Sequence, residues 1–243
     1  MAYRVACRVS YDGSAYHGWQ RQPRELSVQE VIEASLQQLH NGAEISIYGA
    51  SRTDQGVHAL GQVFHFDTTI DIPIERMALA INTYLPEDIF ITEAKVVEDH
   101  FHARKSVFKK TYCYKLMVNQ YLPHERHRMG FYKGELNLES MQQAIKELIG
   151  THDFSAFTQH ATYDSYDRTI YAATLTETDT GLELIITGSG FLRHMVRIIM
   201  GTLLLIGSNS SVKIKDILAS KDRQQAGLNV APEGLYLLQV DYE

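Results

Sequence analysis

Apolar residues occupy every second position from Tyr3 to Ser10, and this period predicts a strand with one buried face. The tripeptide Tyr11-Asp12-Gly13 that follows is typical of a turn. Ser27 can cap a helix, with Glu30 three residues later, and one apolar stripe continues behind it. The stripe contains Val28, Val31, Ile32, Leu36 and Leu39. The chain is therefore expected to begin with a strand and a helix.

Further alternating and helical patterns complete a first half of the chain. We expect strands at 44–48, 62–68 and 89–97 and a helix at 73–84. The resulting order of elements is βαββαβ. This is the order of the ferredoxin-like fold.

The same order recurs from residue 106, and this internal repeat is the most informative organisational feature of the sequence. Strands are expected at 110–118, 166–177, 182–188 and 234–242, and helices at 138–149 and 195–206. The last helix is apolar nearly all round, so we expect it to be buried. The sequence therefore predicts an α+β fold of two ferredoxin-like halves, residues 1–105 and 106–243.

Length and composition fit an ordinary soluble protein. The chain has 243 residues, of which 44% are hydrophobic and 21% are charged. Its start carries arginines inside a strand-like pattern, which is unlike a secretion signal. The longest apolar run, 195–206, is interrupted by Arg197 and is too short to cross a bilayer. We expect a cytoplasmic protein with no membrane partner, in which Cys7 and Cys113 are buried free thiols.

Charge is unevenly distributed along the chain. The formal net charge is −6, which by itself disfavours a polyanionic partner. Residues 104–133 nevertheless contain eight lysines and arginines and one glutamate, a local charge of +7, so that the remainder carries −13. This segregation favours a protein that meets phosphates on one face. A solvated basic strand and loop without a partner is the alternative.

The segment from Gly49 to Ala59 places an acid, a base and two glycines between two strand-like runs. Gly49 and Gly56 allow backbone angles that other residues avoid, so a sharp loop can present Asp54 at its tip. The residue types alone leave two interpretations open. Asp54 either carries chemistry or accepts a hydrogen bond within a β-turn.

These residues resemble the signature of a known enzyme family. The run Ser51-Arg52-Thr53-Asp54-Gln55-Gly56-Val57-His58-Ala59 is similar to the R-T-D-x-G-V-H-A motif of the tRNA pseudouridine synthase A family, whose aspartate is catalytic. Ser51 stands where many members have glycine, and Gln55 where alanine is frequent. Neither difference touches the acid or the arginine. The resemblance implies that Asp54 is catalytic, and Arg52 can take the place of the extruded target base.

The resemblance covers nearly the whole chain. It implies one continuous, mainly antiparallel sheet built from both halves, with helices on one face and a central cleft across the other. It also implies conversion of uridine to pseudouridine at nucleotides 38 to 40, in the anticodon stem-loop of tRNA, by a homodimer. The isomerisation neither adds nor removes atoms, so no cofactor and no metal are expected. Whether Asp54 attacks the sugar or removes a proton from it stays open.

Two arginines are candidates for a partner that keeps Asp54 charged, because a carboxylate in a closed pocket is stabilised by a neighbouring cation. Arg197 closes a segment that resembles the family's H-M-V-R motif, and Arg104 ends one that resembles F-H-A-R. A lone arginine in an apolar helix is costly to bury without a carboxylate, which favours Arg197. As alternatives, Arg197 pairs with another acid and Arg104 contacts a phosphate.

Several further residues follow from the resemblance or from their surroundings. Tyr112 resembles the first tyrosine of the family's K-x-Y-x-Y strand, which lies against the target uracil, whereas Tyr114 is expected in the core. Leu235 resembles a leucine that covers the base, with an ordinary strand position as the alternative. We expect Trp19 to pack under the loop and His58 to form hydrogen bonds within it.

Two other functional classes compete with an enzyme of this kind. Eleven histidines invite a metal site, with pairs at His100 and His102 and at His124 and His127. Neither pair has cysteine or carboxylate ligands at the spacing of a zinc site. A noncatalytic RNA-binding module would carry exposed aromatic residues in an RNP-like strand, and the sequence shows no such run. The sequence therefore favours the enzyme.

Overall fold

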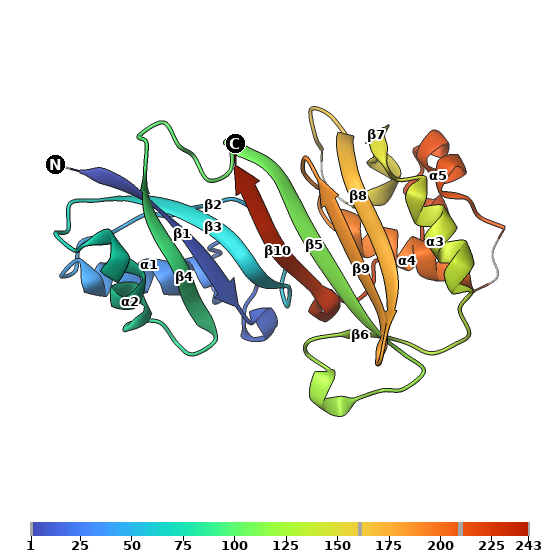
Figure 1. Cartoon of the computed structure of the whole chain (residues 1–243), viewed down its shortest axis with the longest axis horizontal. Helices are drawn as coiled ribbons and strands as arrows, with labels where there is room; N and C mark the ends of the chain where they lie inside the picture. The colour runs from blue at the N-terminus through green and yellow to red at the C-terminus, as the bar shows by residue number, and fades with distance from the viewer. Residues whose placement is uncertain (1, 160–161, 209–210, 243) are drawn as a thin grey trace. The chain divides into compact units, whose positions relative to one another are not determined.

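The computed structural model describes residues 2–159, 162–208 and 211–242 and divides the chain into two compact units (Figure 1). One unit comprises Met1–Phe108 with Tyr236–Glu243, and the other comprises Lys109–Leu235. The last strand, which the sequence analysis placed in the second half, thus packs with the first unit. The sequence placed the boundary between residues 105 and 106, whereas this division falls after Phe108. The expected boundary stays a prediction.

The first unit has the predicted βαββαβ order. Its elements are β1 (Tyr3–Tyr11), α1 (Val28–Leu39), β2 (Tyr48–Gly49), β3 (His58–Thr68), α2 (Ile74–Asn82) and β4 (Ile89–Val97). The sheet runs β4-β1-β3 with antiparallel neighbours, and β2 is antiparallel to β3. The closing strand β10 (Leu235–Tyr242) runs parallel to the start of β3, where Tyr236 pairs with His58. Helices α1 and α2 lie beside each other against this sheet (Figure 1).

Alternate residues of β1 and β3 build the core of the first unit. Val5 pairs with Phe66 and Cys7 pairs with Phe64, and all four side chains are buried. Ser27 caps α1 as predicted, because its hydroxyl accepts a hydrogen bond from the Glu30 amide at 3.3 Å. The alternation and the cap therefore account for the first strand and the first helix.

One predicted strand is wrong. The sequence suggested a strand at 44–48, whereas β2 contains only Tyr48 and Gly49. The backbone of Ile47 bonds to side chains of α1 instead: its amide donates to Glu33 Oε1 at 3.2 Å, and its carbonyl accepts from Gln29 Nε2 at 3.4 Å. Polar side chains of a helix thus satisfy backbone groups that a neighbouring strand would otherwise satisfy.

The second unit contains a sheet in the order β5-β9-β8-β7 with antiparallel neighbours, and β6 runs parallel to β5. Its strands are β5 (Val107–Val118), β6 (Gly130–Tyr132), β7 (Gly150–Asp153), β8 (Asp167–Thr178) and β9 (Gly181–Gly188). Its helices are α3 (Leu138–Lys146), α4 (Met195–Gly207) and α5 (Ile214–Ser220). Strands β6 and β7 and helix α5 were not predicted. The predicted α+β class and the mainly antiparallel pairing are confirmed.

Helix α4 is the buried apolar helix that the sequence predicted. Within the described part of the chain, no helix combines the length and the apolar character that crossing a membrane would require. The two free thiols are also buried as expected. Burial, together with nearby Glu183, raises the pKa of the Cys113 thiol to about 12.

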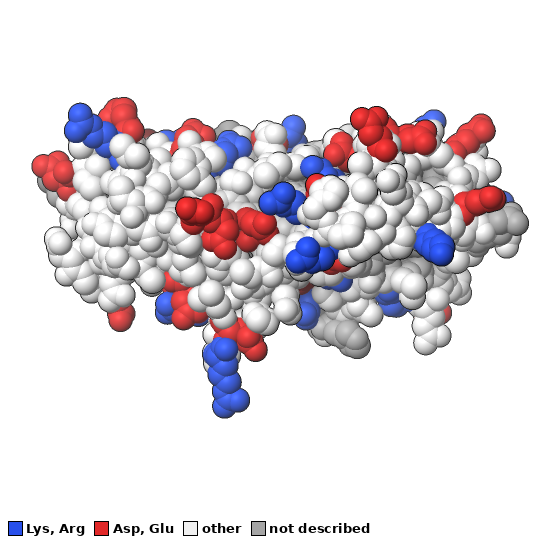
Figure 2. Space-filling view, turned by 90° about the horizontal axis from the view of Figure 1, so that it is seen from below, with Lys and Arg blue, Asp and Glu red and all other residues white. Residues whose placement is uncertain are grey.

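Charged side chains of both signs are interspersed on the face drawn in Figure 2. Lysines and arginines do not form a single basic field on this face. The charge segregation that the sequence predicted is therefore not a property of this side of the molecule.

Candidate active site

The loop between β2 and β3 is held on several sides. The Gln62 side chain bonds to both the amide and the carbonyl of Ser51, at 3.2 and 2.7 Å. The Tyr11 and Thr53 hydroxyls lie 2.8 Å apart, and the Thr53 carbonyl accepts a hydrogen bond from the Trp19 amide at 3.1 Å. Trp19 is 2% exposed, which confirms that it packs under the loop. The residue before Asp54 is thus fixed from two directions.

Asp54 begins a tight turn at the tip of this loop. Its carbonyl accepts a hydrogen bond from the Val57 amide at 3.2 Å, and Gly56 takes the left-handed φ of 75°. The Gly56 amide in turn donates to the Tyr16 carbonyl at 3.3 Å. Asp54 as a whole residue is partly exposed. The backbone therefore makes the turn that the glycine predicted, and it presents the acid at the surface of its unit.

His58 bonds to a different segment from the one expected. Its Nδ1 lies 3.1 Å from the Gly13 amide, which donates to it, and 3.2 Å from Asp12 Oδ1. Its ring stacks on Tyr236, with 4.6 Å between centroids. His58 thus ties the start of β3 to the turn after β1, and a bond of His58 within the loop stays a prediction.

The segment that carries Arg104 is anchored across the open face of the same sheet. Arg4 donates to the Phe101 carbonyl at 2.8 Å, and His65 Nδ1 accepts from the Ala103 amide at 3.1 Å. The Tyr242 hydroxyl donates to the Ala103 carbonyl at 2.8 Å. Burial, with Arg4 nearby, lowers the pKa of His65 to about 4, which keeps this acceptor neutral. Arg104 thus extends from an anchored segment, although its own side chain is exposed.

The structure brings Arg52 and Arg104 to one cavity of about 440 Å³. The cavity is also lined by Tyr48, His102 and Lys105, none of which the sequence predicted as a residue of this site. Tyr48 stacks on His65, with 5.2 Å between centroids, and lies 5.7 Å from His102. Both arginines could be predicted from the sequence, because each lies in a segment that resembles a family motif. Only the pairing of β2 with β3 places the aromatic rings beside them.

The candidates of the second unit occupy different environments. Tyr112 is buried in β5 and packs edge-on against Phe191 at 5.1 Å. Tyr114 lies in the core as expected, and its hydroxyl donates to the Ala231 carbonyl at 2.7 Å. Arg197 is 9% exposed in the first turn of α4. Its Nε donates to the Val230 carbonyl at 2.7 Å.

Leu235 stands at the start of β10 and is 6% exposed. In the preceding turn, a Cβ on Gly234 would lie 2.5 Å from the Lys115 carbonyl oxygen and 2.7 Å from the Tyr114 ring. The short turn before Leu235 therefore packs tightly on β5, which fixes the point at which the closing strand begins.

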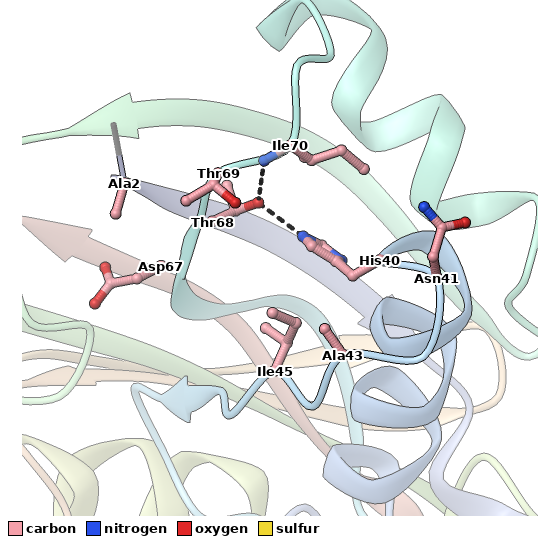
Figure 3. Close-up of a pocket in the computed structure, with 9 residues that line it drawn as sticks. All are labelled: Ala2, His40, Asn41, Ala43, Ile45, Asp67, Thr68, Thr69 and Ile70. Carbon is pink, nitrogen blue, oxygen red and sulfur yellow. Dashed lines mark hydrogen bonds between the residues drawn. The ribbon is translucent and has the colours of Figure 1, made fainter.

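A second cavity in the first unit, of about 350 Å³, lies between the end of α1 and the end of β3 (Figure 3). Its polar groups already bond to one another. His40 Nδ1 lies 2.7 Å from the Leu36 carbonyl, so His40 Nε2 accepts from the Thr68 hydroxyl at 2.7 Å. The Thr68 oxygen also accepts from the Ile70 amide at 3.0 Å. None of the predicted site residues lines this cavity.

The histidine pairs considered as metal ligands have other surroundings. His102 contacts the rings of Tyr48 and His65, and its Nδ1 accepts from the Arg104 amide at 3.1 Å. His124 is 73% exposed and lies 4.0 Å from Glu125. Among the described residues, no three side chains of the metal-binding types gather closely enough to hold an ion.

Comparisons with known proteins show similarity to one family over most of the chain. A family model described as tRNA pseudouridine synthase matches residues 8–104 and 144–243. The chain is 44% identical over 245 residues to tRNA pseudouridine synthase A of Bacillus subtilis (strain 168), covering 99% of both chains. It is 45% identical over 243 residues to the protein of the same name from Shouchella clausii (strain KSM-K16), covering 98% of this chain and 93% of the relative.

A third relative, tRNA pseudouridine synthase A of Streptococcus pneumoniae (strain 70585), is 44% identical over 246 residues and covers 99% of each chain. The ranges of the family model contain Arg52, Asp54, Arg104, Arg197 and Leu235. Tyr112 lies between the two ranges. Its segment is thus covered by the full-length relatives alone.

Proposed function

Because this chain belongs to the tRNA pseudouridine synthase family, we propose that it isomerises uridine in the anticodon stem-loop of tRNA, at nucleotides 38 to 40, with Asp54 as the catalytic residue. The chain is a pseudouridine synthase and hence an isomerase. One observation carries the assignment to Asp54. Asp54 is a partly exposed residue at the tip of a loop whose backbone is fixed at Ser51, Thr53 and Gly56.

The reaction breaks the bond between ribose C1′ and N1 of the base and forms a bond between C1′ and C5. A proton leaves C5 and one is gained at N1, so the product is an isomer of the substrate. One carboxylate suffices for either chemical route, as nucleophile at the sugar or as base toward it. Either route needs a carboxylate in a fixed position, and the backbone hydrogen bonds at Thr53 and Gly56 fix the turn that carries Asp54.

A guanidinium is proposed to hold the Asp54 carboxylate in its charged form, and Arg197 is the preferred donor. Its burial in an otherwise apolar helix supports this role, since a buried cation is stable only when it is paired and hydrogen-bonded. The bond from Nε to the Val230 carbonyl holds the guanidinium in place, and the planar guanidinium fork matches the geometry of a carboxylate. Arg104 is proposed to contact a phosphate, which fits its exposed side chain.

A uridine stacked in a stem must leave the helix to react, which costs a few kcal/mol of unstacking. We assign to Arg52 the place that the base vacates, because a planar guanidinium stacks on bases and also binds phosphate. Tyr112 is proposed to lie against the uracil, and Leu235 to cover its other side. The burial of Tyr112 and Leu235 supports a dry pocket rather than an open surface.

The assembly and the location of the protein belong to the same proposal. We propose that two copies of the chain form a homodimer in the cytoplasm. The basic segment 104–133, with its local charge of +7, is proposed to meet the phosphates. No cofactor is required, since the overall reaction transfers neither atoms nor electrons to another molecule.

The test is to incubate the purified protein with tRNA transcripts that carry uridine at 38, 39 or 40 in turn. Each product is mapped for pseudouridine at single-nucleotide resolution. We expect modification at these positions and none in the D or T arms. Modification confined to another region of the tRNA would reject the proposed target while leaving the enzyme class intact.

A further inference from the structure

The cavity beside the catalytic loop has the composition of a nucleotide site. Arg52, Arg104 and Lys105 bring three cations to its wall, against the single carboxylate of Glu33. Glu33 is already engaged, since it accepts from the Ile47 amide at 3.2 Å and lies 3.3 Å from Arg21. The three cations are exposed, and none makes an ion pair with another residue in the described ranges. An anion is therefore the ligand that this wall favours.

An aromatic surface lies beside the cations. The Tyr48 residue is 54% exposed although its ring stacks on His65 at an interplanar angle of 21°. His102 packs against the same histidine, 4.9 Å away. Burial, with Lys105 nearby, lowers the pKa of His102, as burial does for His65, so these rings are neutral at physiological pH. The result is a group of packed rings whose outer member, Tyr48, is about half exposed.

The aromatic surface formed by Tyr48, His65 and His102 is rigid because strand pairing and hydrogen bonds hold these residues in place. Tyr48 lies in β2, which pairs with β3 opposite His65 itself. His65 holds the Ala103 amide, and the His102 amide donates to the Ser106 hydroxyl at 3.1 Å. Order in the free protein lowers the entropy that binding must remove. The cavity is thus formed before any ligand arrives.

We infer that this cavity binds the nucleotide next to the target uridine, with its base stacked on Tyr48 and its phosphate held by Arg104 and Lys105. Arg52 lines this cavity and also belongs to the loop that carries Asp54, which lies two residues further along the chain. A stacked base and a bound phosphate would hold the RNA strand while the uridine is extruded. The inference rests on the proposed function, since it assigns a second subsite for the same RNA.

Aromatic stacking accepts any base, because every base has a π face. The subsite therefore anchors the strand without reading its sequence. It gives Tyr48 and Lys105 a role in binding RNA rather than in the chemical step. Substitution of either residue is expected to weaken binding and raise the KM. The rate at which bound substrate reacts should stay close to that of the wild type.

The test measures the binding of an anticodon stem-loop RNA to the full chain that carries Asp54→Asn, so that no turnover occurs. In this background Tyr48→Ala is expected to weaken binding about 5- to 100-fold. Tyr48→Phe, which keeps the ring, is expected to restore it. Tyr84→Ala serves as the matched control, because Tyr84 is 43% exposed and does not line the cavity. Lys105→Ala is expected to lower the salt dependence of binding by about one phosphate contact.

A second set of RNAs identifies the base. Abasic residues are placed one at a time on each side of the target uridine. At one position the abasic RNA should bind weakly to the protein that retains Tyr48. Its affinity should not fall further when Tyr48→Ala is introduced. Unchanged affinity in Tyr48→Ala, or the absence of such coupling at every position, overturns the inference. The proposed function fails separately, through absence of pseudouridine in tRNA treated with wild-type protein.

Discussion

The hydroxyl of Tyr11 lies 2.8 Å from the hydroxyl of Thr53, the residue that precedes Asp54. This buried contact joins the end of β1 to the catalytic loop. The same threonine accepts a backbone hydrogen bond from Trp19, whose ring lies under the loop. The position of Asp54 in the loop is thus set by contacts of the residue before it.

Removing this contact is expected to lower the rate and leave binding unchanged. Tyr11→Phe deletes one partner and costs about 0.5–1.5 kcal/mol. Because the loss falls on the orientation of Asp54, we expect kcat to fall up to about tenfold. Thr53→Val and the double variant complete a cycle, measured by single-turnover kinetics. Additive losses in the double variant would show that the two hydroxyls do not act together.

Gly18 supports the loop through its backbone. It has a φ of 85°, and a Cβ there would lie 2.4 Å from the Thr53 carbonyl oxygen. Gly18→Ala is therefore expected to cost more than about 2 kcal/mol of unfolding free energy and to reduce activity. Gly42→Ala is the control, since Gly42 has a φ of 94° with nothing within 4 Å of a Cβ. Its expected cost is about 1 kcal/mol, with full activity.

Urea unfolding of both glycine variants measures this difference. Equal costs for Gly18→Ala and Gly42→Ala would mean that backbone angle alone matters and that the contact with Thr53 does not constrain the loop.

The roles of Arg197 and Arg104 can be distinguished by the kinetic constant that each substitution changes. Arg197→Lys removes the Nε donor to Val230 and the planar guanidinium, so we expect kcat to fall about 10²- to 10³-fold. Arg104→Ala is expected to raise KM about tenfold and to reduce the salt dependence of binding by about one phosphate. The opposite pattern, in which Arg104→Ala lowers kcat and Arg197→Lys raises KM, would exchange the two roles.

Stability is expected to depend on pH through His65. Burial, with Arg4 nearby, holds its folded pKa at about 4, below the ordinary histidine value of 6.5. The unfolded chain therefore binds the proton more readily between these pH values. The contribution of neutral His65 is complete above pH 6.5 and is lost as the pH falls toward 4. Between pH 7 and pH 5 we expect a loss of about 2 kcal/mol from this group.

Urea unfolding at the two pH values tests this expectation. His65→Gln keeps an acceptor for the Ala103 amide but does not titrate, so its stability should change less between pH 7 and pH 5. His124→Gln, at a residue whose side chain is 73% exposed, should behave as the wild type. A pH dependence of His65→Gln as steep as that of the wild type would contradict the assignment.

The sequence predicted those parts of the fold that a local pattern determines. Apolar alternation located β1 and β4, and the Ser27 cap located the start of α1. The strand at 44–48 was predicted wrongly because its alternation is genuine but its backbone partners are side chains of α1. Alternation reports a buried face, and it does not report which groups satisfy the backbone.

The candidate site shows the same division. Asp54, Arg52 and Arg104 were selected from short motifs, and the last two line one cavity. Tyr48 and Lys105 were not selected as site residues, although residue 48 ends an expected strand and Lys105 lies in the basic segment 104–133. Their proximity depends on the antiparallel register of β2 and β3 and on the anchoring of residues 101–104, which a single sequence does not specify.

The most direct test of the account is the amount of pseudouridine that Asp54→Asn forms in tRNA under single-turnover conditions, with the affinity for the same tRNA measured in parallel. The substitution keeps the size and shape of the side chain and removes only its charge. We predict no detectable pseudouridine and an affinity close to that of the wild type, with Asp71→Asn, at an exposed position, fully active. Turnover by Asp54→Asn at the wild-type rate would contradict the role of Asp54.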